Sequence, residues 1–285
     1  MIQYSILIPT FNNLDYLKLA IKSIKENSKY KHEIILHIND GSDGTLEYAK
    51  KEELIYTHSE TNIGLCSAIN KAAKKISTKY VLYVHDDMYL CKHWDEFLEK
   101  EIEILESDLF YLSGTNYELR DIDNQYNPGN SPKQFNPDIF HEFCMKKKEK
   151  DLQGSHWAPH IISKRLWDIV GGFSEEFNPG DGSDPDFCMK LWINNVRIFK
   201  SIDKFKVFHF GSRTTRNKKI VKNNGTKKFL LKYGFNPKFF RKYYLRGGAN
   251  SVYDGPLAEP KKSVIQLLEL FVNKIKIFFY RISFK

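Results

Sequence analysis

The stretch Tyr80-Val81-Leu82-Tyr83-Val84-His85-Asp86-Asp87-Met88 joins a run of apolar residues directly to a pair of carboxylates. A short apolar run bounded by polar residues is typical of a buried strand. Carboxylates at the end of such a strand are costly unless they bind a cation or take part in chemistry. A second acidic cluster, Asp184-Pro185-Asp186, follows later in the chain. The two clusters predict a metal-and-phosphate site that faces a separate catalytic base.

Short apolar runs alternate with helical spacing on both sides of this stretch. Strands are predicted at residues 4–8, 33–38, 54–57 and 80–84, and helices at residues 14–24, 63–76 and 94–105. This alternation predicts a mostly parallel sheet with helices on both faces. In sheets of this kind, ligands bind outside the carboxyl ends of the strands. We therefore expect Pro9-Thr10, Asn39-Asp40 and Asp86-Asp87 to converge in space.

The second half of the chain is less regular. Residues 116–150 are polar and predict a loop-like excursion, and residues 151–210 predict a second globular part that ends in a strand at 205–210. A short helix is expected at 187–192, directly after the second acidic cluster. Ser183-Asp184-Pro185 is also a good helix start, which makes N-capping the alternative role for both carboxylates. The 285 residues suffice for one large α/β domain with additions.

The chain is basic, with 44 Lys and Arg against 35 Asp and Glu. Basic residues are dense between Arg213 and Arg246, where aromatic residues are also frequent. Proteins of this charge bind nucleic acid, anionic lipid or phosphorylated substrates, and a general bias toward lysine accounts for the charge equally well. Because residues 213–246 hold no known nucleic-acid-binding motif, no nucleic-acid partner is expected.

The cysteines and the hydropathy pattern point to the cytosol. Cys66, Cys91, Cys144 and Cys188 form no C-x-x-C pair and predict free thiols in a reducing compartment. The N-terminal residues lack the layout of a signal peptide. No stretch reaches the ~18 uninterrupted apolar residues of a membrane span. We therefore expect a cytoplasmic chain.

The tail at residues 261–285 has its own pattern. Its apolar residues recur at the spacing of one helix face from Val264 to Ile282, and Lys274, Lys276 and Arg281 lie among the polar positions. A basic amphipathic helix can lie in a membrane interface. It can equally pack on its own domain or on a second subunit in a homodimer. The sequence leaves these alternatives open.

Six segments of the chain form an ordered set. They are SILIPTFN at 5–12, NDGSDGT at 39–45, NIGL at 62–65 with Asn70, HDD at 85–87, GGFSE at 171–175 with DPD at 184–186, and VFHFGS at 207–212. In this order they resemble the motifs of family 2 glycosyltransferases. The resemblance implies a GT-A (Rossmann-like) domain over residues 1–213, with a nucleotide-binding half at 1–110 and an acceptor and catalytic half at 111–213. Residues 214–260 then form a basic, aromatic extension, and residues 261–285 a C-terminal amphipathic helix.

The resemblance implies an inverting, metal-dependent transfer of a hexosyl or N-acetylhexosaminyl group. The donor is expected to be a nucleotide-sugar, with UDP as the nucleotide, and the acceptor a glycan or lipid-linked saccharide of surface polysaccharide or lipopolysaccharide synthesis. The donor-binding residues are expected to be Pro9, Thr10, Phe11, Asn12, Asn39, Asp40, Asn62, Gly64 and Asp86. Asp87 and His209 are expected to bind Mn²⁺ or Mg²⁺, which would neutralise the diphosphate leaving group.

The resemblance assigns the catalytic base to Asp184. Such a base takes the proton of the acceptor hydroxyl opposite the leaving group. Asp186 is expected to orient the site near the acceptor or to cap the following helix. Trp157 and His160 are expected either to stack on an acceptor sugar or to pack in the core. Such an enzyme would work at the inner face of the cytoplasmic membrane.

Three positions depart from the family pattern. His85 replaces the first acidic residue of the metal motif, Ser183 replaces a Glu before the base, and Asn39 replaces an Asp that reads the nucleobase. His85 is either a metal ligand or a structural residue. The departures leave an inactive transferase-like scaffold and a nucleic-acid-binding protein as alternatives. A sugar nucleotidylyltransferase would need a Gly-rich basic loop after the first strand, where this chain has the residues PTFNN at 9–13.

Overall fold

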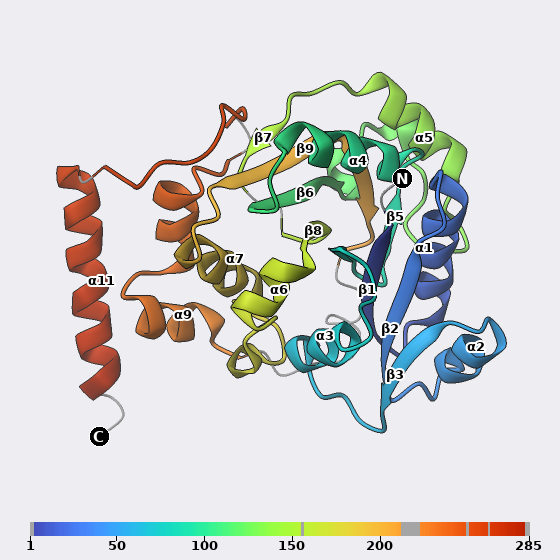
Figure 1. Ribbon diagram of the computed structural model, residues 1–285, viewed down its shortest axis with the longest axis horizontal. Helices are drawn as coiled ribbons and strands as arrows, with labels where there is room; N and C mark the ends of the chain where they lie inside the picture. Colours follow the sequence, from blue (N-terminus) through green and yellow to red (C-terminus); the bar gives the residue numbers. More distant parts are fainter. Residues whose placement is uncertain (1–2, 155–156, 212–222, 249–250, 262, 283–285) are drawn as a thin grey trace.

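The computed structural model describes residues 3–154, 157–211, 223–248, 251–261 and 263–282. Its centre is one sheet with strands in the order β3-β2-β1-β4-β8-β6-β9-β5, and β7 pairs with β9 (Figure 1). The strands are β1 (Tyr4–Phe11), β2 (Glu33–Asn39), β3 (Ile55–Ser59), β4 (Tyr80–Tyr83), β5 (Met88–Leu90), β6 (Phe110–Tyr117), β7 (Leu152–Gln153), β8 (His160–Ser163) and β9 (Ile198–His209). The expected α/β architecture is confirmed.

The first half of the sheet is parallel, from β3 through β2 and β1 to β4. Its strands alternate with α1 (Leu14–Asn27), α2 (Thr45–Lys51) and α3 (Leu65–Ala73). Figure 1 shows α1 and α3 on opposite sides of β1 and β2. In α1 the apolar spacing buries Leu17, Ile21 and Ile24, as the sequence predicted. Because Phe11 pairs with Asn39, the loops after β1 and β2 begin side by side.

The second half of the sheet is mixed and continuous with the first. Strand β8 runs antiparallel to both β4 and β6, and β6 runs parallel to β9. Helix α4 (Trp94–Leu105) lies where the sequence predicted a helix. The two halves therefore share one sheet and one hydrophobic core.

Residues 116–150 are more ordered than their polar composition predicted. They contain η1 (Leu119–Asp121), η2 (Asn124–Tyr126) and α5 (Pro137–Lys146). The loop prediction is therefore wrong for α5, whose residues Phe140 and Phe143 are buried. Asn136 caps this helix by accepting hydrogen bonds from the first-turn amides, and Pro137 favours its start.

The acidic cluster at 184–186 lies inside a helix. After α6 (Lys164–Val170) and η3 (Glu175–Phe177), helix α7 runs over Ser183–Ile193. Of the two possible starts, Ser183 is correct and Phe187 is wrong, because Asp184 and Asp186 both lie in the first turn. Carboxylates are favourable there because the amide groups of a helix N-terminus carry partial positive charge.

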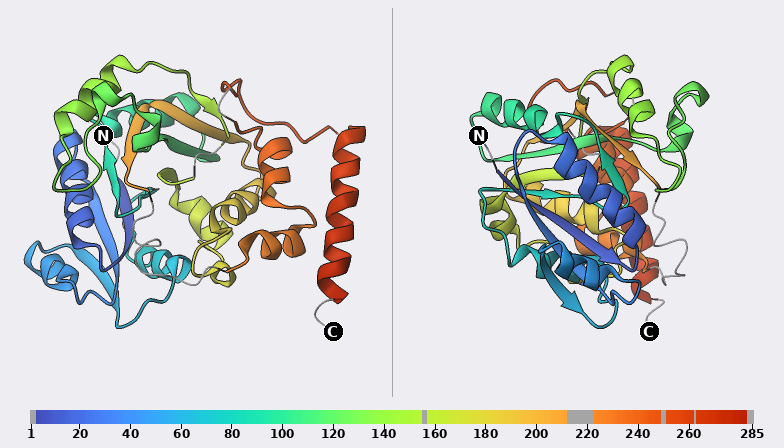
Figure 2. Two further views of the ribbon diagram at one scale, coloured as in Figure 1. Left: turned by 180° about the vertical axis from the view of Figure 1, so that it is seen from behind. Right: turned by 90° about the vertical axis from the view of Figure 1, so that its right-hand side faces the viewer.

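The C-terminal extension packs as a group of helices beside α7. It consists of α9 (Gly225–Tyr233), α10 (Pro237–Phe239), the π-helix η4 (Phe240–Tyr244) and α11 (Val264–Ile282). Figures 1 and 2 show α11 at the end of the molecule opposite α1 and α2. No described helix is long and apolar enough to cross a membrane. The expected boundary at 213–214, and the first basic residues after it, lie outside the described residues.

Candidate active site

The carboxyl ends of β1 and β4 meet at Asp86. The pairing of these strands continues to Val84, whose amide donates to the carbonyl of Leu7 at 3.1 Å. This register brings Asp86 beside Thr10, and the hydroxyl of Thr10 donates to the Asp86 carboxylate at 2.7 Å. Both side chains are buried. The convergence that the sequence predicted for these two strand ends is therefore confirmed.

The next residue, Asp87, faces the end of β9. Strand β5 begins directly after Asp87 and pairs antiparallel with β9, so that Met88 lies opposite His209. The amide of Phe210 donates to the carbonyl of Asp87 at 3.0 Å. As a result His209 Nε2 lies 3.3 Å from Asp87 Oδ1. The pairing of two strands far apart in the chain thus makes the contact between these two expected metal ligands.

His85 completes a candidate metal centre with Asp87 and His209. One ligand atom from each residue lies within 4.8 Å of the others. Burial, followed by the nearby charge of His209, lowers the pKa of His85 to about 4, so its imidazole is neutral. Its Nε2 atom is buried and has no hydrogen-bond partner in the described part of the chain. A neutral imidazole with an unshared lone pair is ready to bind a metal.

The charge state of His209 depends on Asp87. Burial opposes protonation of His209, but the hydrogen bond and the charge of Asp87 more than offset it, so the pKa of His209 is raised. A divalent cation at this position would replace the proton as the partner of Asp87. Two imidazoles with one carboxylate suit Mn²⁺ better than Mg²⁺, which prefers oxygen ligands alone. The residues therefore fit a bound divalent cation.

Glu118 is a residue of this centre that sequence reasoning missed. It directly follows β6, and its Oε1 atom lies 3.7 Å from Nδ1 of His209. A carboxylate on the second nitrogen of a histidine orients the ring and raises its basicity. The signal that could have found Glu118 is its place at the end of a strand, the same signal that identified Asp86 and Asp87.

Asp184, the expected base, lies in a different environment. Burial raises its pKa to about 7. Its Oδ1 atom is buried and has no hydrogen-bond partner among the residues that the structure describes. A carboxylate whose pKa lies near neutral pH takes up and releases protons most effectively under cellular conditions. The position therefore suits a general base.

Tyr83 lies near both this carboxylate and the metal centre. Its ring packs on those of His85 and Phe173, with centroid distances of 5.3 and 5.5 Å. Burial, with the nearby charge of Asp184 as the next cause, raises the pKa of its hydroxyl well above the ordinary value. The Tyr83 hydroxyl also has no hydrogen-bond partner within the described ranges. Three buried polar atoms without partners, on His85, Tyr83 and Asp184, thus gather in one region, as expected where a ligand binds.

Asp186 is fully buried at 0% exposure, and its partners come mainly from the C-terminal extension. Its carboxylate accepts hydrogen bonds from Ser174 at 2.6 Å, Lys232 at 2.8 Å and Tyr233 at 2.7 Å. Lys232 and Tyr233 lie at the end of α9, outside the segments that resemble the family. The buried position leaves no exposed surface for an acceptor, and these partners favour the alternative in which Asp186 orients the site.

The loops after β1 and β2 are joined through Asn12. Its amide donates to the Asp40 carboxylate at 2.9 Å, and its Oδ1 accepts from the amide of Gly41 at 2.8 Å. Asn12 and Asp40 both have left-handed backbone conformations, with φ of 44° and 62°, which Asn and Asp adopt more readily than most residues. These contacts hold the two loops in one arrangement.

Asn39 is more buried than its neighbours in the expected donor site, Asp40 and Asn62. It is 4% exposed, and its Oδ1 accepts from the amide of Ile63 at 3.0 Å. Asn62 accepts from the amide of Gly64 at 2.9 Å. Asn39 therefore positions the 62–64 turn from its buried side, whereas Asp40 and Asn62 lie nearer the surface.

Two asparagines that sequence reasoning did not place in the site connect its halves. The Asn178 side chain accepts from the amides of Cys66 and Ser67 at the start of α3. A Cβ at Gly64 would lie 2.5 Å from Asn178 Oδ1, so a larger residue there would displace this side chain. The Asn70 side chain bonds both the amide and the carbonyl of Phe173. Helix α3 is thereby fixed to the segment that leads to Asp184.

Trp157 lies just before β8, and His160 is the first residue of that strand. His160 is 1% exposed and packs against the rings of Tyr83, Tyr111 and Phe187. It has no free ring face, so the geometry favours the packing alternative for this residue. Trp157 is only partly buried, and its carbonyl accepts from the Tyr111 hydroxyl at 3.0 Å. Trp157 therefore stays a candidate for stacking on an acceptor sugar.

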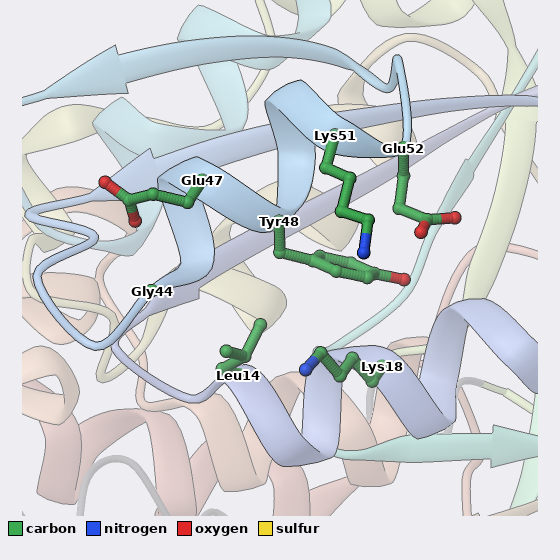
Figure 3. A pocket seen from close by; sticks show the side chains of 7 residues that line it. All are labelled: Leu14, Lys18, Gly44, Glu47, Tyr48, Lys51 and Glu52. Atoms are coloured by element: carbon green, nitrogen blue, oxygen red, sulfur yellow. The ribbon is translucent and has the colours of Figure 1, made fainter.

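A separate hollow lies between α1 and α2 (Figure 3). It has a volume of about 350 Å³ and is lined by Leu14, Lys18, Gly44, Glu47, Tyr48, Lys51 and Glu52. Figure 3 shows the Tyr48 ring beside the side chains of Lys18 and Lys51. None of its lining residues belongs to the predicted site, and its mixture of acids and lysines favours no ligand class.

Comparison with known proteins identifies the family. A family profile described as "Glycosyl transferase family 2" matches residues 5–170. The chain is 28% identical over 219 residues to an uncharacterized glycosyltransferase of Rickettsia bellii (strain RML369-C), a match that covers 74% of this chain and 29% of that protein. It is 26% identical over 232 residues to the chondroitin synthase of Pasteurella multocida (strain Pm70), covering 77% of this chain and 22% of that one.

A solved structure has a similar fold. The crystal structure of S. aureus TarS 1–349 in complex with UDP-GlcNAc superposes with a TM-score of 0.59 at 16% identity, over 99% of this chain and 73% of that chain. This likeness supports the expected GT-A architecture. The chain itself spans only 22–29% of the length of the first curated relatives. Since the family profile covers more than half of the chain, and the fold is of the expected kind, this protein belongs to glycosyl transferase family 2.

Proposed function

We propose that the protein is a metal-dependent, inverting glycosyltransferase that uses a UDP-sugar. The acceptor is a glycan or lipid-linked saccharide in the synthesis of surface polysaccharide or lipopolysaccharide. The observation that carries the proposal is the pairing of two groups. Asp184 has a pKa of about 7, and the Tyr83 ring, whose hydroxyl is influenced by Asp184, packs against His85 of the cluster of His85, Asp87 and His209. A base and a cation site are the two requirements of an inverting transfer from a diphosphate donor.

In the proposed reaction the acceptor hydroxyl attacks the anomeric carbon of the donor. As the new C–O bond forms, the bond to the diphosphate oxygen breaks, and Asp184 takes the proton of the hydroxyl. A divalent cation held by His85, Asp87 and His209 would supply positive charge to the departing diphosphate. The Glu118 carboxylate lies 3.7 Å from Nδ1 of His209. The Thr10 hydroxyl donates to the Asp86 carboxylate, so that Asp86 can receive the donor's ribose.

The nucleoside is proposed to lie over the ends of β1 and β2. Pro9, Thr10 and Phe11 would hold the uracil and ribose through their backbone groups. Asp40 would read an edge of the base, supported by Asn12. Asn39 would act indirectly, through the turn that contains Asn62 and Gly64. The UDP-GlcNAc complex of TarS supports a uridine nucleotide, since the folds agree.

The acceptor is proposed to approach from the side of Trp157 and the first turn of α7. The similarity to a chondroitin synthase supports a saccharide acceptor of the hexosyl or N-acetylhexosaminyl type. The four cysteines are free thiols, in keeping with the proposed cytoplasmic location. We propose that the enzyme acts as a peripheral protein at the inner face of the membrane, where lipid-linked acceptors are presented.

The deciding experiment measures binding and hydrolysis of a panel of nucleotide-sugars with Mn²⁺, Mg²⁺ or a chelator. We expect turnover of one UDP-sugar that needs a metal and is lost in Asp87→Ala. Asp168→Asn is a matched control, because Asp168 is an exposed carboxylate in a surface ion pair with Lys164. Failure of every nucleotide-sugar to bind would overturn the proposal in favour of an inactive scaffold.

A further inference from the structure

Helix α11 packs on the protein with its polar side. The residues that face the body recur at helical spacing and are Gln266, Glu269, Leu270, Asn273, Ile277 and Tyr280. Gln266 and Asn273 are the buried residues of the helix. This arrangement is the reverse of the usual one, in which a surface helix buries its apolar side.

Polar contacts hold the helix in this orientation. Asn236 donates to the Asn273 side chain at 3.1 Å. Lys242 and Tyr243 bond Glu269 at 2.6 and 3.0 Å, and the ammonium of Lys227 lies 4.6 Å from the centre of the Tyr280 ring. These contacts lie at several points along the helix and all fix the same orientation. The opposite face of the helix therefore points away from the body of the protein.

The outward face is apolar along the whole helix. Ten side chains are exposed there, among them Val264 at 74% and Phe271 at 61%; the others are Ile265, Leu267, Leu268, Val272, Ile275, Phe278, Phe279 and Ile282. Elsewhere in the described residues, exposed large apolar side chains such as Ile104 and Met145 occur singly. A contiguous apolar face that is exposed to solvent marks an interaction site.

The charges beside this face have one sign. Helical periodicity places Lys274 and Arg281 along one edge of the apolar face and Lys276 along the other, and all three are exposed. The acidic residue of the helix, Glu269, faces inward and is already paired with Lys242. An apolar face between two cationic edges complements a bilayer with anionic headgroups, since the phenylalanines enter the acyl region and the cations meet the phosphates.

A second copy of the chain is a poorer occupant. Packing two α11 faces together would bring the cationic edges of both copies into one interface. Glu269, the acidic residue of the helix, would not neutralise them, because it faces inward and is already paired with Lys242. Like charges brought together at an interface oppose association. We propose that α11 lies on an anionic membrane surface with its apolar face inserted. The role assigned to this surface, bringing the enzyme to a lipid-borne acceptor, rests on the proposed function.

The test is cosedimentation of the full chain with vesicles of phosphatidylcholine, with or without an equal part of phosphatidylglycerol. We expect binding to the anionic vesicles that weakens as salt is added. Phe271→Ser with Phe278→Ser should weaken binding on the order of 100-fold, since each buried Phe contributes about tenfold or more. Changing Lys274, Lys276 and Arg281 to Gln should remove the preference for anionic lipid.

A matched control removes exposed apolar side chains from another part of the surface. Ile104→Ser with Met145→Ser should leave vesicle binding unchanged. The assay contains no donor or acceptor, so its result does not depend on whether sugar transfer occurs. Sedimentation velocity without lipid gives the oligomeric state. Absence of vesicle binding, or a dimer that Phe271→Ser with Phe278→Ser makes monomeric, would overturn the proposal.

Discussion

Asp87 and Asp184 are both carboxylates in the interior of the site, yet their surroundings are opposite. Asp87 lies 3.3 Å from the imidazole of His209 and belongs to a cluster with His85. Asp184 Oδ1 is buried without a hydrogen-bond partner in the described residues, and burial raises its pKa to about 7. A carboxylate beside imidazoles suits metal binding, and a buried carboxylate without such neighbours suits proton transfer. The difference in neighbours therefore separates two roles for the same side chain.

The largest expected effect is that of Asp184→Asn. The amide cannot accept the proton of the acceptor hydroxyl, so kcat should fall by about 10³-fold. Binding of the UDP-sugar, measured by calorimetry, should stay within about twofold of wild type. Asp168→Asn serves as the control, and a kcat within tenfold of wild type in Asp184→Asn would assign the base to another residue.

The same variant should be more stable than wild type at high pH. The pKa of Asp184 is raised in the folded protein from its ordinary value of 3.8 to about 7. The unfolded chain therefore ionises first, and wild-type stability falls as the pH rises from about 4 to about 7. Asn carries no charge, so above pH 7 the free energy of unfolding should increase on the order of 2 kcal/mol. Thermal denaturation at pH 4 and pH 8 checks this, and an equal difference at both would contradict it.

The variant His85→Ala tests the metal centre that contains Asp87. Removing one of three ligands should weaken Mn²⁺ binding by about 10–100-fold, with a matching loss of activity at limiting metal. Excess Mn²⁺ should restore part of the activity, which it cannot do for Asp184→Asn. Titration of Mn²⁺ followed by electron paramagnetic resonance measures the affinity. Unchanged affinity would assign His85 to a purely structural role.

The pH dependence of kcat/KM in the wild-type enzyme separates the role of Asp184 from that of the metal centre. At saturating Mn²⁺ the metal centre is fully formed, and kcat/KM should fall about tenfold per pH unit below about 7, as Asp184 becomes protonated. Metal affinity should also fall with decreasing pH, because His209, whose pKa is raised, must lose its proton to bind. Rate profiles at two Mn²⁺ concentrations distinguish these effects. A flat profile between pH 5 and 8 would contradict both.

The smallest expected effect is that of Tyr233→Phe. It removes one hydrogen bond of 2.7 Å to Asp186, so the fold should lose about 1 kcal/mol and kcat should fall a few-fold with KM unchanged. Tyr243→Phe is the matched control, because its hydroxyl bonds Glu269 on α11 far from Asp186 in the sequence. Equal effects of the two variants on kcat would show that Tyr233 does not position the base.

Local pattern was enough for much of the fold. Apolar runs and helical spacing identified the parallel strands and α1, α3 and α4, because each of these elements buries a face whose apolar residues recur regularly in its own sequence. The pattern failed at α5, whose short apolar stripe lies among polar residues, and it left the start of α7 open between Ser183 and Phe187. At α5 the Asn136 cap and the burial of Phe140 and Phe143 outweighed composition.

The site residues likewise divide into those that the sequence identified and those that it missed. Asp86, Asp87, Asp184 and His209 could be chosen from the sequence, because they lie in the segments that resemble the family motifs. Glu118, Asn178 and Lys232 could not, because each acts through a contact with a residue far away in the chain. His85 remained undecided until the pairing of β5 with β9 brought His209 beside it.

The sequence by itself determined the alternation of strands and helices, the family and the residues able to carry the chemistry, because these depend on residue type and spacing along the chain. Only the tertiary structure decided which carboxylate has an imidazole neighbour, which is left without one, and which side of α11 faces outward. Those properties depend on burial and on partners from distant segments, which spacing along a single chain does not encode.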